Sequence, residues 1–236
     1  MVQFERITRP RRDAFILSIL LILAELASGE DRGLVLLQRL QAAVGGVQKI
    51  IAIQDYEETV VAETFSTSGE PRGTVPKRVR WITPSFLRID QTGPGSTYVL
   101  IFDGTSGWEI LPNRASPDRT EGGPIVLTGT ELNFAKNYAA SMYFQVWLAD
   151  RIPGYSISSP QENVIRVVTG TGQGVDITLD PTTWLPTSES AIPNQPNRAP
   201  SQEMHYERWG FSDGIRFPAR RVNSHNGKQL AVLIMV

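Results

Sequence analysis

The order of apolar and polar residues divides the chain into a helical start and a longer part with the alternation of strands. Between Gly33 and Val44 the apolar residues recur at helical spacing, and Asp31 is placed to cap the helix. Gly45-Gly46 ends this helix, and residues 47–53 are expected to form a short second helical turn or lead-in. The pattern predicts an amphipathic N-terminal helix that must pack on another element.

From Tyr56 onward the pattern is that of short strands separated by Gly, Pro, Asp-Gly and Asn-Gly turn signals. Residues 97–102 are apolar on both alternating faces, which predicts a central strand. Residues 192–200 are rich in Pro and Asn and are expected to form a surface loop. We expect strands at residues 56–66, 75–82, 86–91, 97–102, 107–111, 164–169, 174–179, 184–191, 204–211, 215–224 and 230–235.

One further helix is expected in the middle of the chain. Thr128-x-x-Glu131 has the form of a capping box, and the apolar residues that follow it keep a 3.6-residue period. We therefore predict a single helix over Thr130–Asp150, with a broad aromatic face that is more typical of a core than of a ligand surface. With hairpin-connected strands around it, the plan is an antiparallel α+β fold. No repeat or linker divides residues 30–236, so we expect one domain.

The first residues have the layout of a secretory signal peptide. A basic stretch, Arg6 to Arg12, precedes an apolar run over residues 14–24, and Ala27-Ser28-Gly29 supplies small residues for cleavage. The run is shorter than the ~20 apolar residues that a transmembrane helix needs. Residues 1–29 are therefore predicted to be a signal peptide cleaved near Gly29, and the mature chain to be periplasmic or secreted without a stable membrane span. An uncleaved signal anchor is the alternative.

Composition and charge restrict the functional classes. The chain has 41% apolar and 20% charged residues, as globular proteins do, and its net charge of −1 gives no basic bias towards nucleic acid. Lys77, Arg78, Arg80 and Arg88 cluster, as alternating strand positions near a surface commonly do. The absence of cysteine excludes disulfides, thiolate catalysis, cysteine-based metal sites and a lipid-modified N-terminal Cys in this sequence.

The sequence contains no recognisable catalytic motif: it has no nucleophile elbow, no phosphate-binding P-loop and no zincin motif. Glu57 and Glu58 are adjacent and are expected to face opposite sides of a strand, where they cannot readily share a proton. Alternation places Glu203, His205 and Glu207 on one strand face, which is the one arrangement that suggests a metal-dependent enzyme. A solvent-facing polar strip is the other interpretation. We expect no enzyme and no cofactor.

Aromatic side chains are spread over the predicted strands and the central helix. A curved sheet that wraps around a helix can leave an apolar cavity, although ordinary core packing accounts for the same residues. The residues that would line such a cavity are Val79, Trp81, Leu87, Phe102, Trp108, Phe134, Tyr138, Met142 and Trp147.

Several segments, in order, resemble the periplasmic lipoprotein carriers and outer-membrane lipoprotein-sorting proteins (LolA/LolB-like). They are Lys77 to Arg88 with its Thr-Pro break, Tyr98 to Trp108 with Asp-Gly-x-x-x-Trp, Thr178 to Pro186, and Tyr206 to Pro218 with its Asp-Gly and late Pro. The matches extend across roughly residues 33–235. The carriers have an Arg directly before the strand Pro, where it helps to latch a lid, and Thr83 stands at that position here.

This resemblance implies an antiparallel, incomplete β-barrel closed by an N-terminal helix and a central helix. It also implies a binding protein without a cofactor, which holds an acyl chain, lipid or lipoprotein in an apolar cavity and takes part in outer-membrane lipoprotein sorting. The alternatives are an envelope protein-interaction module with a solidly packed barrel and, less favoured, a metal-dependent enzyme around His205.

Overall fold

A single antiparallel sheet dominates the computed structural model, which describes residues 32–93, 96–111, 123–192 and 202–236. Its order is β6-β5-β4-β3-β2-β1-β13-β12-β11-β10-β9-β8-β7, so the sheet stays open, with β6 and β7 at its edges. The thirteen strands of the described chain are β1 Asp55–Phe65, β2 Pro71–Ile82, β3 Phe86–Gly93, β4 Ser96–Phe102, β5 Gly107–Ile110, β6 Ile125–Val126, β7 Ser156–Gln161, β8 Val164–Val168, β9 Gly174–Leu179, β10 Pro186–Ala191, β11 Gln202–Ser212, β12 Ile215–His225 and β13 Lys228–Met235.

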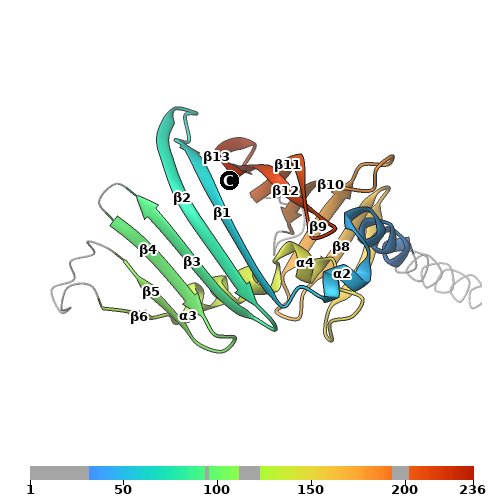
Figure 1. Ribbon diagram of the computed structural model, residues 1–236, viewed down its shortest axis with the longest axis horizontal. Coiled ribbons are helices and arrows are strands. Elements are labelled where there is room, and N and C mark those ends of the chain that lie inside the picture. Colours follow the sequence, from blue (N-terminus) through green and yellow to red (C-terminus); the bar gives the residue numbers. More distant parts are fainter. Residues whose placement is uncertain (1–31, 94–95, 112–122, 193–201) are drawn as a thin grey trace, which may run out of the picture.

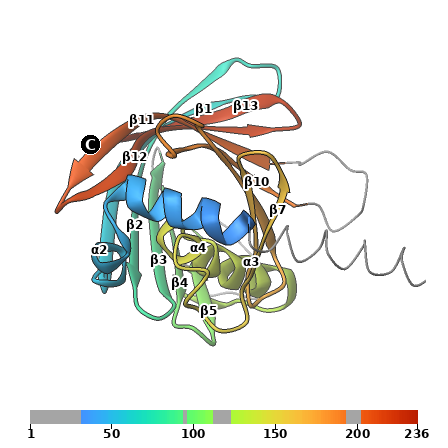
Figure 2. The same cartoon turned by 90° about the vertical axis from the view of Figure 1, so that its right-hand side faces the viewer.

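The sheet curves around the helices, which lie against its concave face (Figures 1 and 2). Neighbouring strands are hairpin partners everywhere except at the middle, where β1 pairs with β13. There Val60 lies opposite Met235 and Ala62 opposite Leu233. The predicted α+β architecture, an incomplete barrel with helices inside its curve, is confirmed.

Strand β1 shows how the sequence determines the two faces of the sheet. Tyr56, Glu58, Val60 and Ala62 alternate with more exposed residues and point to the concave face. Because side chains alternate along a strand, Glu57 faces the convex side. The predicted separation of the two neighbouring glutamates onto opposite faces is therefore confirmed.

The N-terminal helix, described over residues 32–44, lies across the concave face of the sheet (Figure 2). It buries Leu36, Leu37, Leu40 and Val44, whereas Leu34 of the predicted apolar stripe is 37% exposed. Gln41 donates hydrogen bonds to the Trp147 carbonyl oxygen (2.8 Å) and to Asp150 Oδ1 (2.9 Å), which tie this helix to the middle of the chain. The short helix α2 Val47–Ile51 follows it, as predicted.

The prediction of one helix over Thr130–Asp150 is wrong. The structure has α3 Gly129–Ala140 and α4 Tyr143–Val146, separated at Ser141 and by the extended backbone of Met142. Ser141 Oγ donates to the Asn137 carbonyl oxygen at 2.8 Å, a local hydrogen bond of the kind that competes with helix continuation. The capping box is also wrong, because the Thr128 side chain makes no capping hydrogen bond.

Helix α4 stands at the centre of the core. Its Tyr143 and Phe144, with Trp147 just beyond it, are buried among aromatic rings from the sheet. The Phe144 ring lies 4.5 Å from Trp81 and 5.3 Å from Tyr56, centroid to centroid. Because the helix is interrupted after α3, the short α4 can bury Tyr143, Phe144 and the following Trp147 in the core.

Strand boundaries agree well with the alternation of the sequence, and β9 begins and ends where predicted. Two strands, β6 and β7, were not predicted. Strand β7 is rich in Ser and contains Pro160, which is tolerated because β7 is an edge strand. The predicted signal peptide, the Asp31 cap and residues 193–200 of the predicted loop lie outside the described residues.

Candidate functional site

An apolar pocket of about 180 Å³ lies between the first turns of α3 and the strands β4 and β5. Leu100 forms part of its floor on the concave face, and Phe134 on α3 is 55% exposed beside it. An exposed aromatic ring next to an apolar pocket is the kind of surface that takes an apolar ligand. The pocket is lined by Tyr98, Leu100, Glu109, Leu127, Thr130, Glu131 and Phe134.

Most of the predicted cavity lining belongs to the packed core instead of an open space. Two predicted residues lie on α3: Phe134 lines the pocket, and Tyr138, one turn further on, is half-buried. The residues that are buried in the core cluster are Val79, Trp81, Leu87, Phe102, Met142 and Trp147.

Trp108 is not brought together with the other predicted residues. It pairs with Ile101 on β4, whereas Phe102, the next residue, pairs with Leu87 on the concave face. Because neighbouring residues on a strand face opposite sides, Trp108 lies on the convex side of the sheet.

Lys77 links helix α3 to the sheet. Its Nζ lies 3.4 Å from the Tyr138 hydroxyl oxygen, to which it donates a hydrogen bond, and 5.3 Å from the centroid of the Tyr138 ring. Ala135 and Ala139 of α3 are buried in the core, and Leu132 packs against it. Helix α3 forms one wall of the pocket, and it is fixed by these apolar contacts, by the Lys77 link and by the Tyr155 hydroxyl, which donates to the Ala140 carbonyl oxygen at 2.9 Å.

A second unusual feature of the concave face is a buried ion pair. Arg221 Nη2 on β12 donates to both carboxylate oxygens of Glu58 at 3.0 Å, and both side chains are more than nine-tenths buried. The Tyr56 hydroxyl donates to Glu58 at 2.8 Å, and Tyr143 from α4 donates in turn to Tyr56. Burial raises the pKa of both tyrosines, so they remain protonated donors.

This cluster was not predicted from the sequence, although one signal was present. Glu58 occupies the apolar phase of β1, between Tyr56 and Val60, where a carboxylate needs a partner. The partner, Arg221, is separated from it by 163 positions along the chain, and no local pattern joins the two.

Further polar side chains extend the cluster along the same face. Glu189 on β10 pairs with Met204 on β11, and Met204 pairs with Asn223 on β12. Tyr206, two residues after Met204, pairs with Arg221. Burial raises the pKa of Glu189 to about 7, with the Tyr206 hydroxyl and the Arg221 charge acting in the opposite direction.

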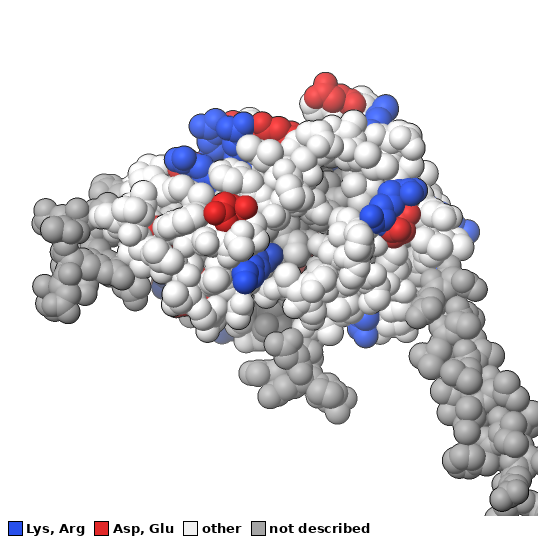
Figure 3. All heavy atoms as spheres, turned by 90° about the horizontal axis from the view of Figure 1, so that it is seen from below, with Lys and Arg blue, Asp and Glu red and all other residues white. Residues whose placement is uncertain are grey.

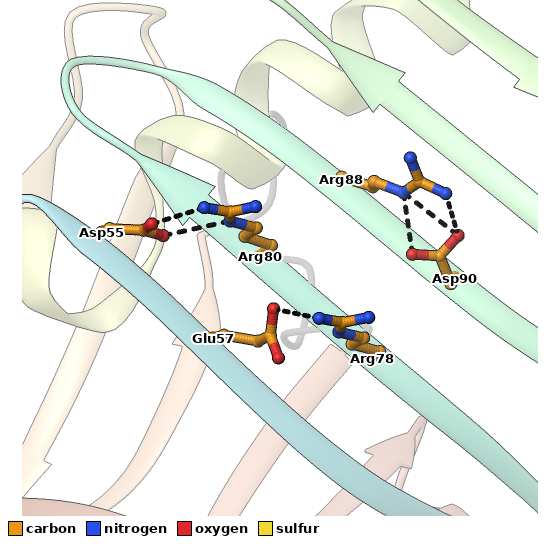
Figure 4. A network of polar contacts seen from close by, with 6 residues as sticks. All are labelled: Asp55, Glu57, Arg78, Arg80, Arg88 and Asp90. Atoms are coloured by element: carbon orange, nitrogen blue, oxygen red, sulfur yellow. Dashed lines mark hydrogen bonds and ion pairs between the residues drawn. The ribbon is translucent and has the colours of Figure 1, made fainter.

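The convex face carries a set of charged side chains that compensate one another (Figure 4). Arg80 pairs with Asp55 at 2.5 Å and Arg78 with Glu57 at 2.6 Å across β1 and β2. Arg88 pairs with Asp90 at 2.9 Å along β3. A shallow depression of about 310 Å³ runs over this region. Each arginine of the predicted cluster has a carboxylate partner, while Lys77 points to the other face, so no surplus of positive charge is left here.

The predicted strip of Glu203, His205 and Glu207 is exposed, and its three members do not converge on one point. His205 Nε2 lies 3.2 Å from Glu203 Oε2, while Glu207 pairs with Arg220. Strand β11 is irregular between Tyr206 and Arg208, which interrupts the alternation there. Within the part of the chain that the structure describes, no group of three His, Cys, Asp or Glu side chains is placed to hold a metal ion.

Seen from below, the molecule presents charged side chains only at scattered places, with wide uncharged areas between them (Figure 3). Among the described residues, no helix is both long enough and apolar enough to cross a membrane.

Comparison with known proteins gives a match in structure but not in sequence. No protein-family model matches the chain, and no curated protein is similar to it in sequence. A DUF1329 family protein from Desulfovibrio piger has a TM-score of 0.57 at 12% identity, over 88% of this chain and 91% of that one.

Two further solved structures carry the name expected from the sequence motifs. A LolA superfamily protein from Nitrosomonas europaea has a TM-score of 0.53 at 12% identity, over 86% of this chain and 91% of that one. The chain shares its fold with this protein. A domain assigned as an outer membrane lipoprotein-sorting protein from Vibrio parahaemolyticus has a TM-score of 0.52, also at 12% identity, over 87% of this chain and 91% of that one. The resemblance stated from the strand and turn motifs is therefore confirmed for the fold.

Proposed function

We propose that this protein is a non-enzymatic binding protein that holds the acyl part of a lipid or lipoprotein beneath α3. The observation that supports it is the apolar pocket under α3, with the exposed Phe134 ring beside it. The shared fold with a lipoprotein-sorting domain supports the same class of ligand. No cofactor is needed, since burial of each methylene supplies about 0.8 kcal/mol.

The size of the pocket adds a condition to this proposal. Its volume of about 180 Å³ is smaller than the ~300 Å³ at which sites for drug-sized ligands begin. The pocket as it stands takes the end of a chain, and a whole acyl chain requires α3 to move away from β4. This movement would break the hydrogen bond between Lys77 and Tyr138 and separate Ala135 and Ala139 from the core.

Mass spectrometry of the natively purified protein, together with titration of a fluorescent long-chain fatty-acid probe, tests the proposal. We expect a co-purifying lipid and micromolar binding. Phe134→Gln should weaken probe binding roughly fivefold, because a half-exposed ring contributes about 1 kcal/mol of apolar burial. Phe211→Gln, the same change at a ring that is 72% exposed on strand β11, is the matched control and should leave binding unchanged. Absence of both lipid and probe binding would refute the carrier role.

The same proposal includes an exported, periplasmic location in which the mature protein acts among envelope proteins. The basic stretch, the apolar run and Ala27-Ser28-Gly29 support it. Expression in a Gram-negative host followed by N-terminal sequencing of the periplasmic fraction should show cleavage after Gly29. A chain that keeps its first residues and sediments with membranes would show the anchor alternative instead.

The packed core supports a second candidate, an envelope protein-interaction module. Trp81 and Trp147 fill the space between the sheet and α4 and leave both indoles almost completely buried. If the barrel cannot open, function lies on its surface. Wild-type protein that fails to bind the probe but retains its fold would favour this candidate.

A further inference from the structure

Three buried polar atoms on the concave face of β10 and β12 have no hydrogen-bond partner among the described residues. They are Oε1 of Glu189, Nε of Arg221 and Oδ1 of Asn223. A buried polar atom without a partner costs about 1–3 kcal/mol, so three of them in one region are unlike ordinary core packing. Arg221 as a whole is only 8% exposed, which places its free Nε–H deep inside the protein.

The sheet register places these three residues near one another on one face of the sheet. Glu189 and Asn223 lie on either side of Met204 in one row across the sheet, so their Cα atoms are two strand spacings apart, roughly 10 Å. Arg221 lies two residues from Asn223 on the same face, and Tyr206 on β11 pairs with Arg221. Glutamate and arginine side chains extend several ångströms, so a group of a few atoms between them can reach all three.

The types of atom define the chemistry of that group. Above its pKa of about 7 the Glu189 carboxyl is ionised, and its Oε1 and the Asn223 Oδ1 then accept hydrogen bonds, whereas Arg221 Nε donates one. An ammonium group supplies donors but no acceptor, and it would face the Arg221 charge. A sulfate or carboxylate supplies acceptors only, and it would face Glu58 and Glu189. An uncharged group with donors and an acceptor on neighbouring atoms satisfies all three positions.

We infer that the concave face of β10–β12 carries a second binding site, built by Glu189, Tyr206, Arg221 and Asn223, for an uncharged carboxamide-like group. The –NH₂ of such a group donates to Glu189 and Asn223, and its carbonyl oxygen accepts from Arg221. Aromatic rings bound the site, since Tyr206 packs on Trp209 at 5.8 Å and Trp209 on Trp147 at 6.4 Å. The site is separate from the pocket beneath α3 and does not depend on the proposed carrier role.

Isothermal titration at about pH 8.5, where Glu189 is ionised, with four probes of one medium alkyl chain length tests the inference on the full-length protein. The probes are the primary amide, the methyl ester, the alkyl ammonium and the alkyl sulfate. We expect the amide to bind tightest. The ester, which has no donor, should bind roughly fivefold or more weakly, as the loss of about 1 kcal/mol from a hydrogen bond implies. Equal binding of ester and amide, or tighter binding of either charged probe, would overturn the site.

Substitutions identify the residues. Asn223→Leu and Glu189→Leu should each weaken amide binding roughly five- to tenfold and leave ester binding nearly unchanged. His205→Leu is the matched control, because His205 lies on the exposed face of β11 and should change neither. Thermal unfolding checks that each variant folds, and should Glu189→Leu fail to fold, Asn223→Leu and the probe series decide. Unchanged amide binding in folded Asn223→Leu would overturn the site.

Failure of the second site and failure of the carrier role give different experimental results. Phe134→Gln should weaken binding of the fatty-acid probe and preserve the preference for amide over ester. Asn223→Leu should leave binding of the fatty-acid probe unchanged and remove the preference for amide over ester. If fatty-acid binding fails and the amide preference remains, only the carrier role is refuted. If fatty-acid binding remains and the amide preference is absent, only the second site is refuted.

Discussion

Glu57 and Glu58 are neighbours in sequence but have opposite environments. Glu57 is exposed and pairs with Arg78 on the convex face, whereas Glu58 is buried and held by Arg221. Alternation alone predicted that the two would point apart, and a surface pair such as Glu57–Arg78 contributes at most about 1 kcal/mol. The buried partner could not be predicted, because it depends on which distant strand the sheet places beside β1.

Glu189 should make the folded protein less stable as pH rises from about 4.5 to about 7. Burial raises the pKa of its carboxyl from 4.5 to about 7, against the smaller opposing effects of Tyr206 and Arg221. Between these values the folded state keeps a proton that the unfolded state has released, so stability falls with rising pH. The contribution is fully present below pH ~4.5 and lost above pH ~7, and is of the order of 3 kcal/mol.

Urea unfolding at about pH 4.5 and about pH 7.5 measures this loss. Glu189→Gln removes the titrating group and should show a smaller fall in the free energy of unfolding between the two conditions than wild type. Glu203→Gln, on the exposed face of the neighbouring β11, should keep the wild-type fall. Identical pH dependence in Glu189→Gln and wild type would contradict the assignment.

At the scale of elements, the predictions succeeded where one face of a strand is buried and the other is not. Strands β9 and β12 show this, since their alternation and their Gly or Asp-Gly boundaries coincide with the observed ends. The helix over 130–150 failed because its 3.6-residue period continues through Ser141 and Met142, where the backbone leaves the helix. The reason is tertiary: α4 must turn its aromatic residues into the core, which the period does not reveal.

Gly45 should be the more sensitive of the two glycines that join the N-terminal helix to α2. Both have a positive φ, +132° at Gly45 and +99° at Gly46, so alanine strains the backbone at either position by roughly 1–2 kcal/mol. At Gly45 the added Cβ would also collide with the carbonyl oxygen of Gly214 in the β11–β12 turn, whereas at Gly46 it meets open space.

We therefore expect Gly45→Ala to lower the free energy of unfolding by about 1–3 kcal/mol more than Gly46→Ala, in line with the usual cost of overpacking. Denaturant unfolding of both variants measures the difference. Equal destabilisation would mean that the β11–β12 turn shifts to make room for the added methyl group without loss of stability.

At the scale of the whole molecule, the fold was more accessible from sequence than the candidate site. The order of turn motifs from Lys77 to Pro218 was enough to indicate an open barrel around helices, because hairpin order determines an antiparallel sheet. The apolar lining was not predictable in the same way. A buried residue such as Leu87 and a pocket residue such as Tyr98 lie on the same face of the sheet, and only the position of α3 decides which one borders the pocket.

The pairing of β1 with β13 has a consequence for how the molecule is made. The other strand pairs join neighbours in sequence and can form locally, whereas this pair brings together the first and last strands of the sheet. Such non-local pairing is slow, since the long chain between the two strands must lose conformational entropy before any stabilising contact forms. Until then β1 has an unpaired edge of eleven residues, which is a template for wrong partners. A nascent chain should therefore depend most on protection by chaperones during the interval between synthesis of β1 and arrival of β13.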